Sequence, residues 1–215
     1  MSDTGRAKRT YNSTRRQAQA RQTRQQIAEA ALRLFGAHGY NGTTIEAIAG
    51  EAGVAPETFY AVFGSKSKVL WHLMNISVGG DDAPVTVMER SGPQEVMQET
   101  SQQQQIQMFA RGIAEIMGRA APVFEIMRSA AEVEPEIAEL IERTSRERWD
   151  NLAGFVSHVQ KNGPLRAGLE TEQAVASVWT MASAPVFLLL TRDHGWSVEA
   201  YVDWLAASLI RLLLP

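Results

Sequence analysis

Cysteine is missing from all 215 residues, so the chain can form neither disulfides nor thiolate metal sites. Long apolar runs are missing as well. The longest, Ala184 to Leu190, is too short to span a bilayer, and the first twenty residues hold no apolar run of the signal-peptide kind. These absences predict a soluble, cytoplasmic protein without membrane association.

Catalytic signatures are also lacking. The four histidines lie far apart in the sequence, and there is no metal-ligand spacing, no nucleophile motif and no phosphate-binding glycine loop. We therefore expect no catalytic residues, no metal and no cofactor. An enzyme whose groups converge only in space is the rival hypothesis of a different class, and measured turnover would support it.

Charge is distributed unevenly along the chain. Residues 1–24 carry seven Lys or Arg and one Asp, whereas residues 71–215 carry eleven basic and nineteen acidic side chains. Clustered cations displace condensed counterions from a phosphate backbone, so a basic front end on an acidic body is typical of a protein that binds a polyanion. The alternative is a solvated, disordered arm.

Apolar residues recur at helical spacing from residue 27 onward, and strand signals are nearly missing, which predicts an all-α protein of about nine helices. Residues 27–35 give a first helix that stops at Gly39. Thr43 to Glu46 has the form of a capping box, with Thr43 as the cap of a second helix that ends at Gly53. A third, short helix starts at Pro56. This spacing predicts a helix-turn-helix unit.

A fourth helix begins at Lys66, capped by Ser65. A positive charge at the first helical position is unfavourable next to the positive end of the helix dipole. A bound anion at this helix end would remove that cost, so the position of Lys66 indicates a phosphate contact. An ordinary exposed lysine is the alternative. Further helices are predicted over residues 93–118, after Pro122, after Pro135, over 171–192 and over 197–213.

The segment "TTIEAIAGEAGVAPETFYAVFGSKSKVL" (residues 43–70) resembles the DNA-binding region of the tetracycline-repressor (TetR-like) family, and "GPLRAGLETEQAV" and "GWSVEAYVDWLAASL" resemble the last two helices of many members. The resemblance implies an all-helical homodimer with a three-helix head that reads double-stranded operator DNA and a body that binds an effector. The implied domains are a basic arm (1–20), a helix-turn-helix DNA-binding domain (21–70) and a ligand-binding and dimerisation domain (71–215).

Carried over by position, the resemblance places Thr44, Tyr60 and Lys66 on phosphates and helix residues 56–58 at base edges. The implied DNA-binding residues are Thr44, Ala55, Pro56, Glu57, Thr58, Tyr60 and Lys66, with Arg21 and Arg24 from the basic end. Two departures stand out: Ala55 replaces the usual Ser or Thr cap, and Val62 replaces a frequent His. Glu57 either accepts a proton from a cytosine amino group or faces solvent or a Lys or Arg partner.

By analogy with the family, the body encloses a mostly hydrophobic effector, although packing is the plainer explanation for each residue. The candidate lining residues are Trp71, Met74, Met108, Phe109, Gly112, Ile116, Phe124, Met127, Trp149, Leu152, Trp179 and Ser183. The last two helices hold more apolar surface than one body of this size easily covers, which predicts a two-fold dimer interface.

The basic front end and the helix-turn-helix spacing predict a DNA-binding protein, and the resemblance implies a sequence-specific transcriptional regulator: a repressor released from a palindromic operator by a small hydrophobic effector. The alternative is a non-specific or architectural DNA-binding protein without an effector.

Overall fold

The computed structural model describes residues 4–215, with side chains described from residue 15 onward. Within this range the chain forms ten α-helices, a 3-10 turn and a π-turn, and no strand. The all-α prediction is therefore confirmed. The elements are α1 (Thr4–His38), α2 (Ile45–Glu51), α3 (Pro56–Val62), α4 (Lys66–Gly79), η1 (Val87–Glu89), α5 (Ser91–Gln98), α6 (Gln102–Ala130), α7 (Pro135–Asn162), α8 (Thr171–Met181), α9 (Ala184–Leu188), η2 (Leu189–Asp193) and α10 (Val198–Leu213).

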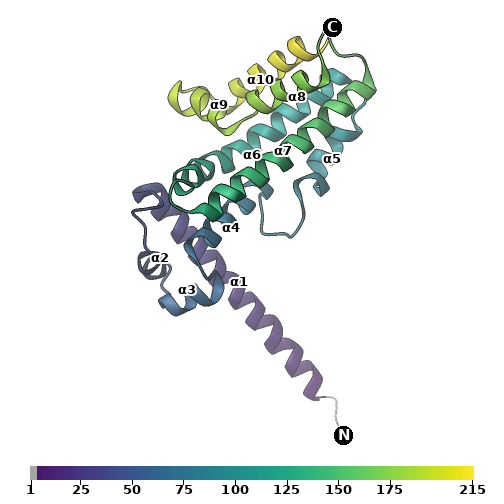
Figure 1. Ribbon diagram of the computed structural model, residues 1–215. Helices are drawn as coiled ribbons and strands as arrows, with labels where there is room; N and C mark the ends of the chain where they lie inside the picture. Colours follow the sequence, from purple (N-terminus) through teal and green to yellow (C-terminus); the bar gives the residue numbers. More distant parts are fainter. Residues whose placement is uncertain (1–3) are drawn as a thin grey trace. The chain divides into compact units, whose positions relative to one another are not determined.

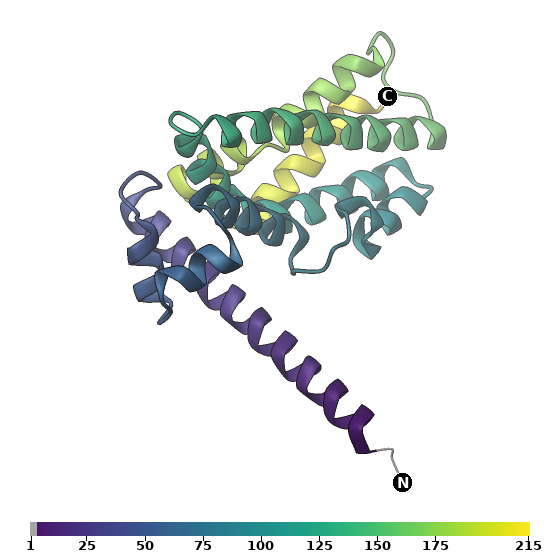
Figure 2. The same cartoon turned by 60° about the horizontal axis from the view of Figure 1, so that its bottom comes forward.

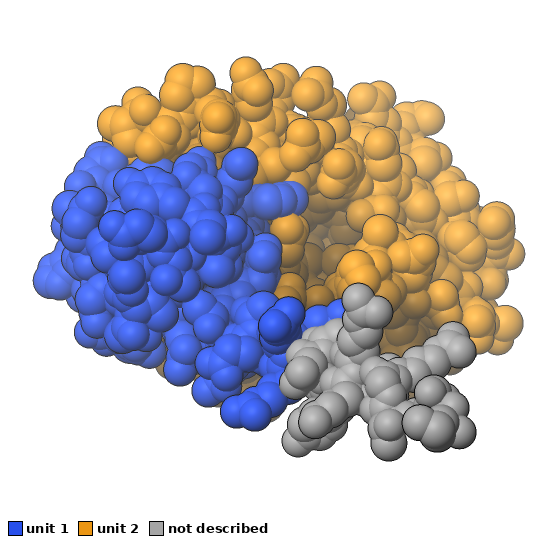
Figure 3. All heavy atoms as spheres, turned by 90° about the horizontal axis from the view of Figure 1, so that it is seen from below, with its two compact units in different colours: residues 1–73 blue, residues 74–215 orange. Residues whose placement is uncertain are grey.

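The chain divides into two compact units, residues 1–73 and residues 74–215, which Figure 3 distinguishes by colour. Helix α4 starts in the first unit and ends in the second. No single helix in the described part of the chain is long and apolar enough to cross a membrane, and only the bent pair formed by α8 and residues 184–193 meets that test by length and composition.

The first unit has a small apolar core at the meeting of α1, α2, α3 and the start of α4 (Figure 1). Ile27 and Ala31 from α1, Ile48 from α2, Phe59 from α3 and Leu70 from α4 are all fully buried. Each of these residues lies on the apolar face of its helix, as expected from helical spacing. Burial of that face stabilises helices as short as α2 and α3, which would not be stable alone.

The loop between α1 and α2 differs from the sequence prediction. Thr44, not Thr43, is the N-cap of α2, and its hydroxyl accepts a hydrogen bond from the Ala47 amide at 3.1 Å. Thr43 is buried and donates to the carbonyl oxygens of Leu34 and Gly39. Either of two adjacent threonines can be the cap in such a sequence pattern. Here Thr43 is buried, and its hydroxyl instead donates to carbonyl oxygens at the end of α1.

The second unit is built around α6, which packs against α7, α9 and α10, while α7 also packs against α8 (Figure 1). Its core contains the stacked pair Phe109 and Phe155, whose ring centroids are 4.1 Å apart, and the fully buried Tyr201 and Leu205 of α10.

The glutamine-rich start of α6 joins the ends of three helices. Gln102 donates to the carbonyl oxygens of Val159 and Gly163, which end α7. Gln105 is completely buried, where it donates to the Val96 carbonyl of α5 and accepts from the Asn162 amide. This low-complexity stretch therefore forms buried contacts, because glutamine can satisfy helix-end carbonyls that would otherwise lack donors.

Three predicted helix boundaries are wrong. The single helix predicted over residues 93–118 is interrupted at residues 99–101, where α5 ends and α6 has not yet begun. Helix α6 runs through Pro122 without stopping; the proline is exposed, and buried residues on both sides of it, Ala121 and Val123, keep the helix packed. The single helix predicted over residues 171–192 instead breaks at Ala182 and Ser183 into α8, α9 and η2. Pro185 lies in the first turn of α9, where proline favours a new helix start.

Candidate nucleic-acid interface and effector pocket

The turn between α2 and α3 is short and well defined. The amide of Val54 donates to the Ala49 carbonyl at 2.9 Å, and Gly53 adopts a left-handed φ of +67°. This is a glycine-terminated helix end, as the sequence predicted. Ala55 is the N-cap of α3 with no side-chain hydrogen bond, and Pro56 occupies the first turn.

Helix α3 has one buried face and one exposed face. Phe59 is fully buried and Phe63, its C-cap, is nearly so, whereas Tyr60 is 51% exposed. Glu57 is exposed as well, and Thr58 is half-buried. The structure therefore brings the α3 residues named by the resemblance together on a short helix held from beneath by phenylalanine packing, with Glu57 and Tyr60 accessible to a partner.

Lys66 has intramolecular partners that sequence reasoning did not anticipate. Its ammonium donates to the carbonyl oxygens of Tyr40 and Thr43 at 2.9 and 3.0 Å and lies 4.0 Å from the centre of the Tyr40 ring. The side chain thus ties the start of α4 to the α1–α2 loop. Ser65 caps α4 as predicted, because its hydroxyl accepts from the Lys68 amide. The phosphate contact predicted for Lys66 stays a prediction.

The two arginines named from the basic end differ in their surroundings. Arg24 is half-buried and its guanidinium lies 4.7 Å from the centre of the Phe63 ring, at the end of α3. Arg21 is exposed. An ion pair between Arg33 and Glu51 at 3.1 Å links α1 to α2.

Most of the predicted effector-lining residues are packed in the second unit. Phe109 and Leu152 belong to its apolar core, and Ile116, Trp149 and Trp179 pack against that core. The remaining predicted residues are buried or half-buried: Met74 and Met127 are buried, and Trp71, Met108, Gly112, Phe124 and Ser183 are half-buried.

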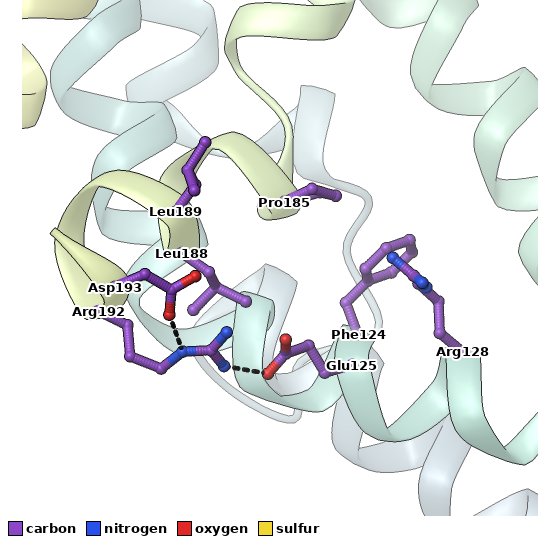
Figure 4. Close-up of a pocket in the computed structure, with 8 residues that line it drawn as sticks. All are labelled: Phe124, Glu125, Arg128, Pro185, Leu188, Leu189, Arg192 and Asp193. Carbon is purple, nitrogen blue, oxygen red and sulfur yellow. Dashed lines mark hydrogen bonds and ion pairs between the residues drawn. The ribbon is translucent and has the colours of Figure 1, made fainter.

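A pocket of about 300 Å³ opens between the second half of α6 and the α9–η2 segment (Figure 4). Phe124 is the one predicted residue among those that line it. Leu188 belongs to the apolar core and Phe124 packs against that core, so the pocket reaches the interior of the unit. Its lining residues are Phe124, Glu125, Arg128, Pro185, Leu188, Leu189, Arg192 and Asp193.

The rim of this pocket is charged. Arg192 forms ion pairs with Asp193 at 2.9 Å and with Glu125 at 2.5 Å, drawn as dashed lines in Figure 4. The hydrogen bonds that Arg192 donates to the Asp193 and Glu125 carboxylates raise the pKa of Arg192 above its usual value. The contact between Arg192 and Glu125 could not be predicted from residue spacing, because the two residues are 67 positions apart.

A half-buried arginine marks the break between α8 and α9. Arg148 donates to the carbonyl oxygens of Trp179 and Ala182, and burial lowers the pKa of Arg148 to about 10. Burial also raises the pKa of the neighbouring Tyr201, whose hydroxyl donates to the Met181 carbonyl. Arg148 satisfies carbonyls freed at the end of α8, and it was not singled out from the sequence.

Comparison with known proteins bears on both units. The family described as bacterial regulatory proteins, tetR family, matches residues 27–72. The HTH-type transcriptional regulator TcmR of Streptomyces glaucescens is 48% identical over 54 residues, which make up 25% of this chain and 24% of that protein. The chain thus matches about a quarter of the length of this curated relative.

Solved structures extend the likeness to nearly the whole chain. NalD, the secondary repressor of the MexAB-OprM multidrug efflux pump in Pseudomonas aeruginosa, aligns with a TM-score of 0.69 and 18% identity over 92% of this chain and 98% of its own. FadR from Bacillus subtilis, in complex with stearoyl-CoA, aligns with a TM-score of 0.65 and 19% identity over 86% and 97%. At these identities the likeness shows the fold.

The match over residues 27–72 covers the helix-turn-helix that the structure shows. Over these residues the chain is similar to the tetR family of bacterial regulatory proteins and to the regulator TcmR.

Proposed function

We propose that this regulator is a repressor that binds a palindromic operator as a homodimer and is released by a small hydrophobic effector. The observation that carries the proposal is the two-sided α3, which buries Phe59 while it exposes Glu57 and Tyr60 within the segment matched to the family. An exposed helix on a rigid support is what insertion into a major groove requires.

The DNA contacts we propose are those named by the resemblance. Tyr60 and Thr44 bind phosphates, and Glu57 and Thr58 lie at base edges. Arginine is missing from residues 55–63, so α3 brings no cation to the duplex. The basic residues before the head, with Arg21 and Arg24, then supply much of the electrostatic affinity.

The homodimer is supported by the final helix. Leu205 and Leu209 of this helix are fully buried inside the single chain. The surface available for a partner is therefore smaller than the sequence suggested. Trp204 and Leu212 remain half-buried, and Trp196 is 38% exposed beside Trp204, with ring centroids 6.2 Å apart. We propose that a second copy covers this surface; a palindromic site then requires the two α3 helices of the dimer to lie about 34 Å apart, or a multiple of it.

Effector binding is assigned to the second unit, with the pocket beside Phe124 and Leu188 as its site. Apolar walls and a charged rim suit a ligand with a hydrophobic body. FadR was solved with stearoyl-CoA, so a protein of this fold can hold a ligand with a long acyl chain. An effector shifts the protein toward the state that it binds more tightly.

Helix α4 provides the route by which the two units are coupled. In the first unit Lys66 fixes its start to the α1–α2 loop. In the second unit Arg119 of α6 donates to the Ser77 carbonyl in its last turn at 3.0 Å. An effector that displaces α6 would therefore act on the far end of the same continuous helix. A coupling of about 1–3 kcal/mol changes operator affinity about 5- to 150-fold.

Operator footprinting on the DNA beside the coding region, with random-sequence competitor, tests the proposal. A protected palindrome that resists the competitor is the expected result, with native mass spectrometry showing a dimer. Equal affinity for every duplex would identify a non-specific or architectural binder instead.

The effector site is tested by filling the pocket. Leu189 is 49% exposed and lines it, so Leu189→Trp should weaken release by an apolar effector without disturbing the core. Val198→Trp is the matched control, because Val198 is 43% exposed and lies outside the pocket lining. Equal release by both variants would place the effector elsewhere.

A further inference from the structure

Helix α1 is far longer than the head requires. It runs without a break from Thr4 to His38, and Figures 1 and 2 show its first half extending away from α2 and α3. Every residue from Arg15 to Gln22 is exposed. The segment "RRQAQARQTRQQ" consists largely of Ala, Gln and Arg, which favour helix without tertiary support. The basic front end is therefore a helical continuation of the head.

Helix geometry fixes which arginine lies on which side of this extension. Buried Ile27 and Ala31 mark the face of α1 that packs in the head. Steps of three and four residues toward the N-terminus place Arg24, Ala20 and Arg16 on the same face. Arg15 lies about 100° from Arg16 around the helix, on the side away from this face.

Arg24 shows that this face of α1 lies next to the end of α3. Its guanidinium lies over the ring of Phe63 at the end of α3. Arg16 is eight residues earlier, roughly 12 Å further along the helix axis. On this face of α1, Arg24 thus lies beside the end of α3, and Arg16 lies further along the same straight helix.

Charge determines which partner suits this face. No acidic residue occurs between Asp3 and Glu29, whereas Arg15, Arg16, Arg21 and Arg24 all lie in that interval. The intervening glutamines can donate to phosphate oxygens as well. A segment of roughly 12 Å corresponds to three or four phosphates along one strand, at about 3.4 Å each.

We infer that the extension of α1 is a second DNA-contacting element held in fixed rotation relative to α3, and that Arg24 and Arg16 bind the phosphate backbone next to the site that α3 reads. The inference rests on the proposed binding of operator DNA. It adds that the basic front end contacts the duplex on one defined face and not as a flexible cationic tail.

The test compares two adjacent arginines that are equal in charge and exposure. Arg16→Gln should lower the slope of log affinity against log salt by about 1 and weaken operator binding about fivefold at 0.15 M salt, equally for all sequences. Arg15→Gln should leave both quantities close to those of the unchanged protein. Equal effects of the two variants, or no effect of either, would overturn the inference.

A second variant tests the rigidity directly. Ala20→Pro keeps every charge but interrupts the helix between Arg16 and the head, and Ala20→Ser is its control. The proline variant should reproduce the loss seen with Arg16→Gln, with an unchanged melting temperature because Ala20 is exposed. Unaltered binding would show that a flexible tail suffices. If the unmodified protein bound no duplex, the proposed function would fail instead, so the two failures are distinguishable.

Discussion

The two units use equally regular helical patterns for opposite purposes. In the first unit, Tyr60 stands exposed beside buried Phe59, so a short helix presents side chains outward. In the second unit, Phe109 and Leu152, predicted to line a ligand site, are packed in the core. The comparison teaches that the exposed face of the proposed DNA-binding helix can be located from sequence, whereas an internal ligand site competes with packing for the same residue types.

The largest expected effect is on stability, and it distinguishes the buried face of α3 from its exposed face. Phe59→Ala should destabilise the first unit by about 3–5 kcal/mol, because Phe59 is fully buried. Tyr60→Ala should change stability by less than about 0.5 kcal/mol yet weaken operator binding. Thermal unfolding and DNA titration of both variants measure the difference. Similar destabilisation by the two substitutions would contradict the two-sided description of α3.

Removal of the basic front end comes next in size. Deletion of residues 1–20 should weaken DNA binding strongly and flatten its salt dependence, because it removes Arg6, Lys8, Arg9, Arg15 and Arg16. Binding at several salt concentrations gives the slope. A slope that stays the same would remove these residues from the interface.

The second unit offers a matched pair in its glutamine run. Gln105→Leu should cost about 1–3 kcal/mol, because the Val96 carbonyl and the Asn162 amide would lose their partner. Gln104→Leu, at an exposed neighbour, should be close to neutral. Chemical denaturation measures the free energy of unfolding of both variants. Equal values for the two variants would mean that water replaces the buried amide.

The smallest expected effect concerns coupling. Arg119→Ala removes the hydrogen bond to Ser77 at the end of α4, so it should reduce the effector-induced change in operator affinity by a few fold, within the usual range of coupling energies. Affinity without effector should stay unchanged. Titration of operator with and without ligand shows whether the response is altered, and an intact response would leave α4 without this role.

Much of the first unit follows from the sequence because its signals are local. Gly53 and Pro56 punctuate the helix-turn-helix, and spacing alone identifies Phe59 as buried. Thr43 was misassigned because two adjacent threonines both fit a capping pattern, and only the position of the α1 carbonyls distinguishes them.

The second unit was less predictable because its key contacts are distant in sequence. Gln102 reaches residues 57 and 61 positions away, and Arg148 reaches the carbonyls of Trp179 and Ala182 across the fold. Pro122 would normally end a helix, yet packing on both sides carries α6 through it. No periodicity in a single chain encodes such pairings.

The engagement of Lys66 with the α1–α2 loop changes how genetic data on this protein should be interpreted. A substitution there would remove one donor from two carbonyl oxygens and loosen the head, so a loss of DNA binding would report impaired folding even if the side chain never contacted a nucleotide. Lys68, exposed one half-turn later, is the better site for mutagenesis aimed at mapping the duplex.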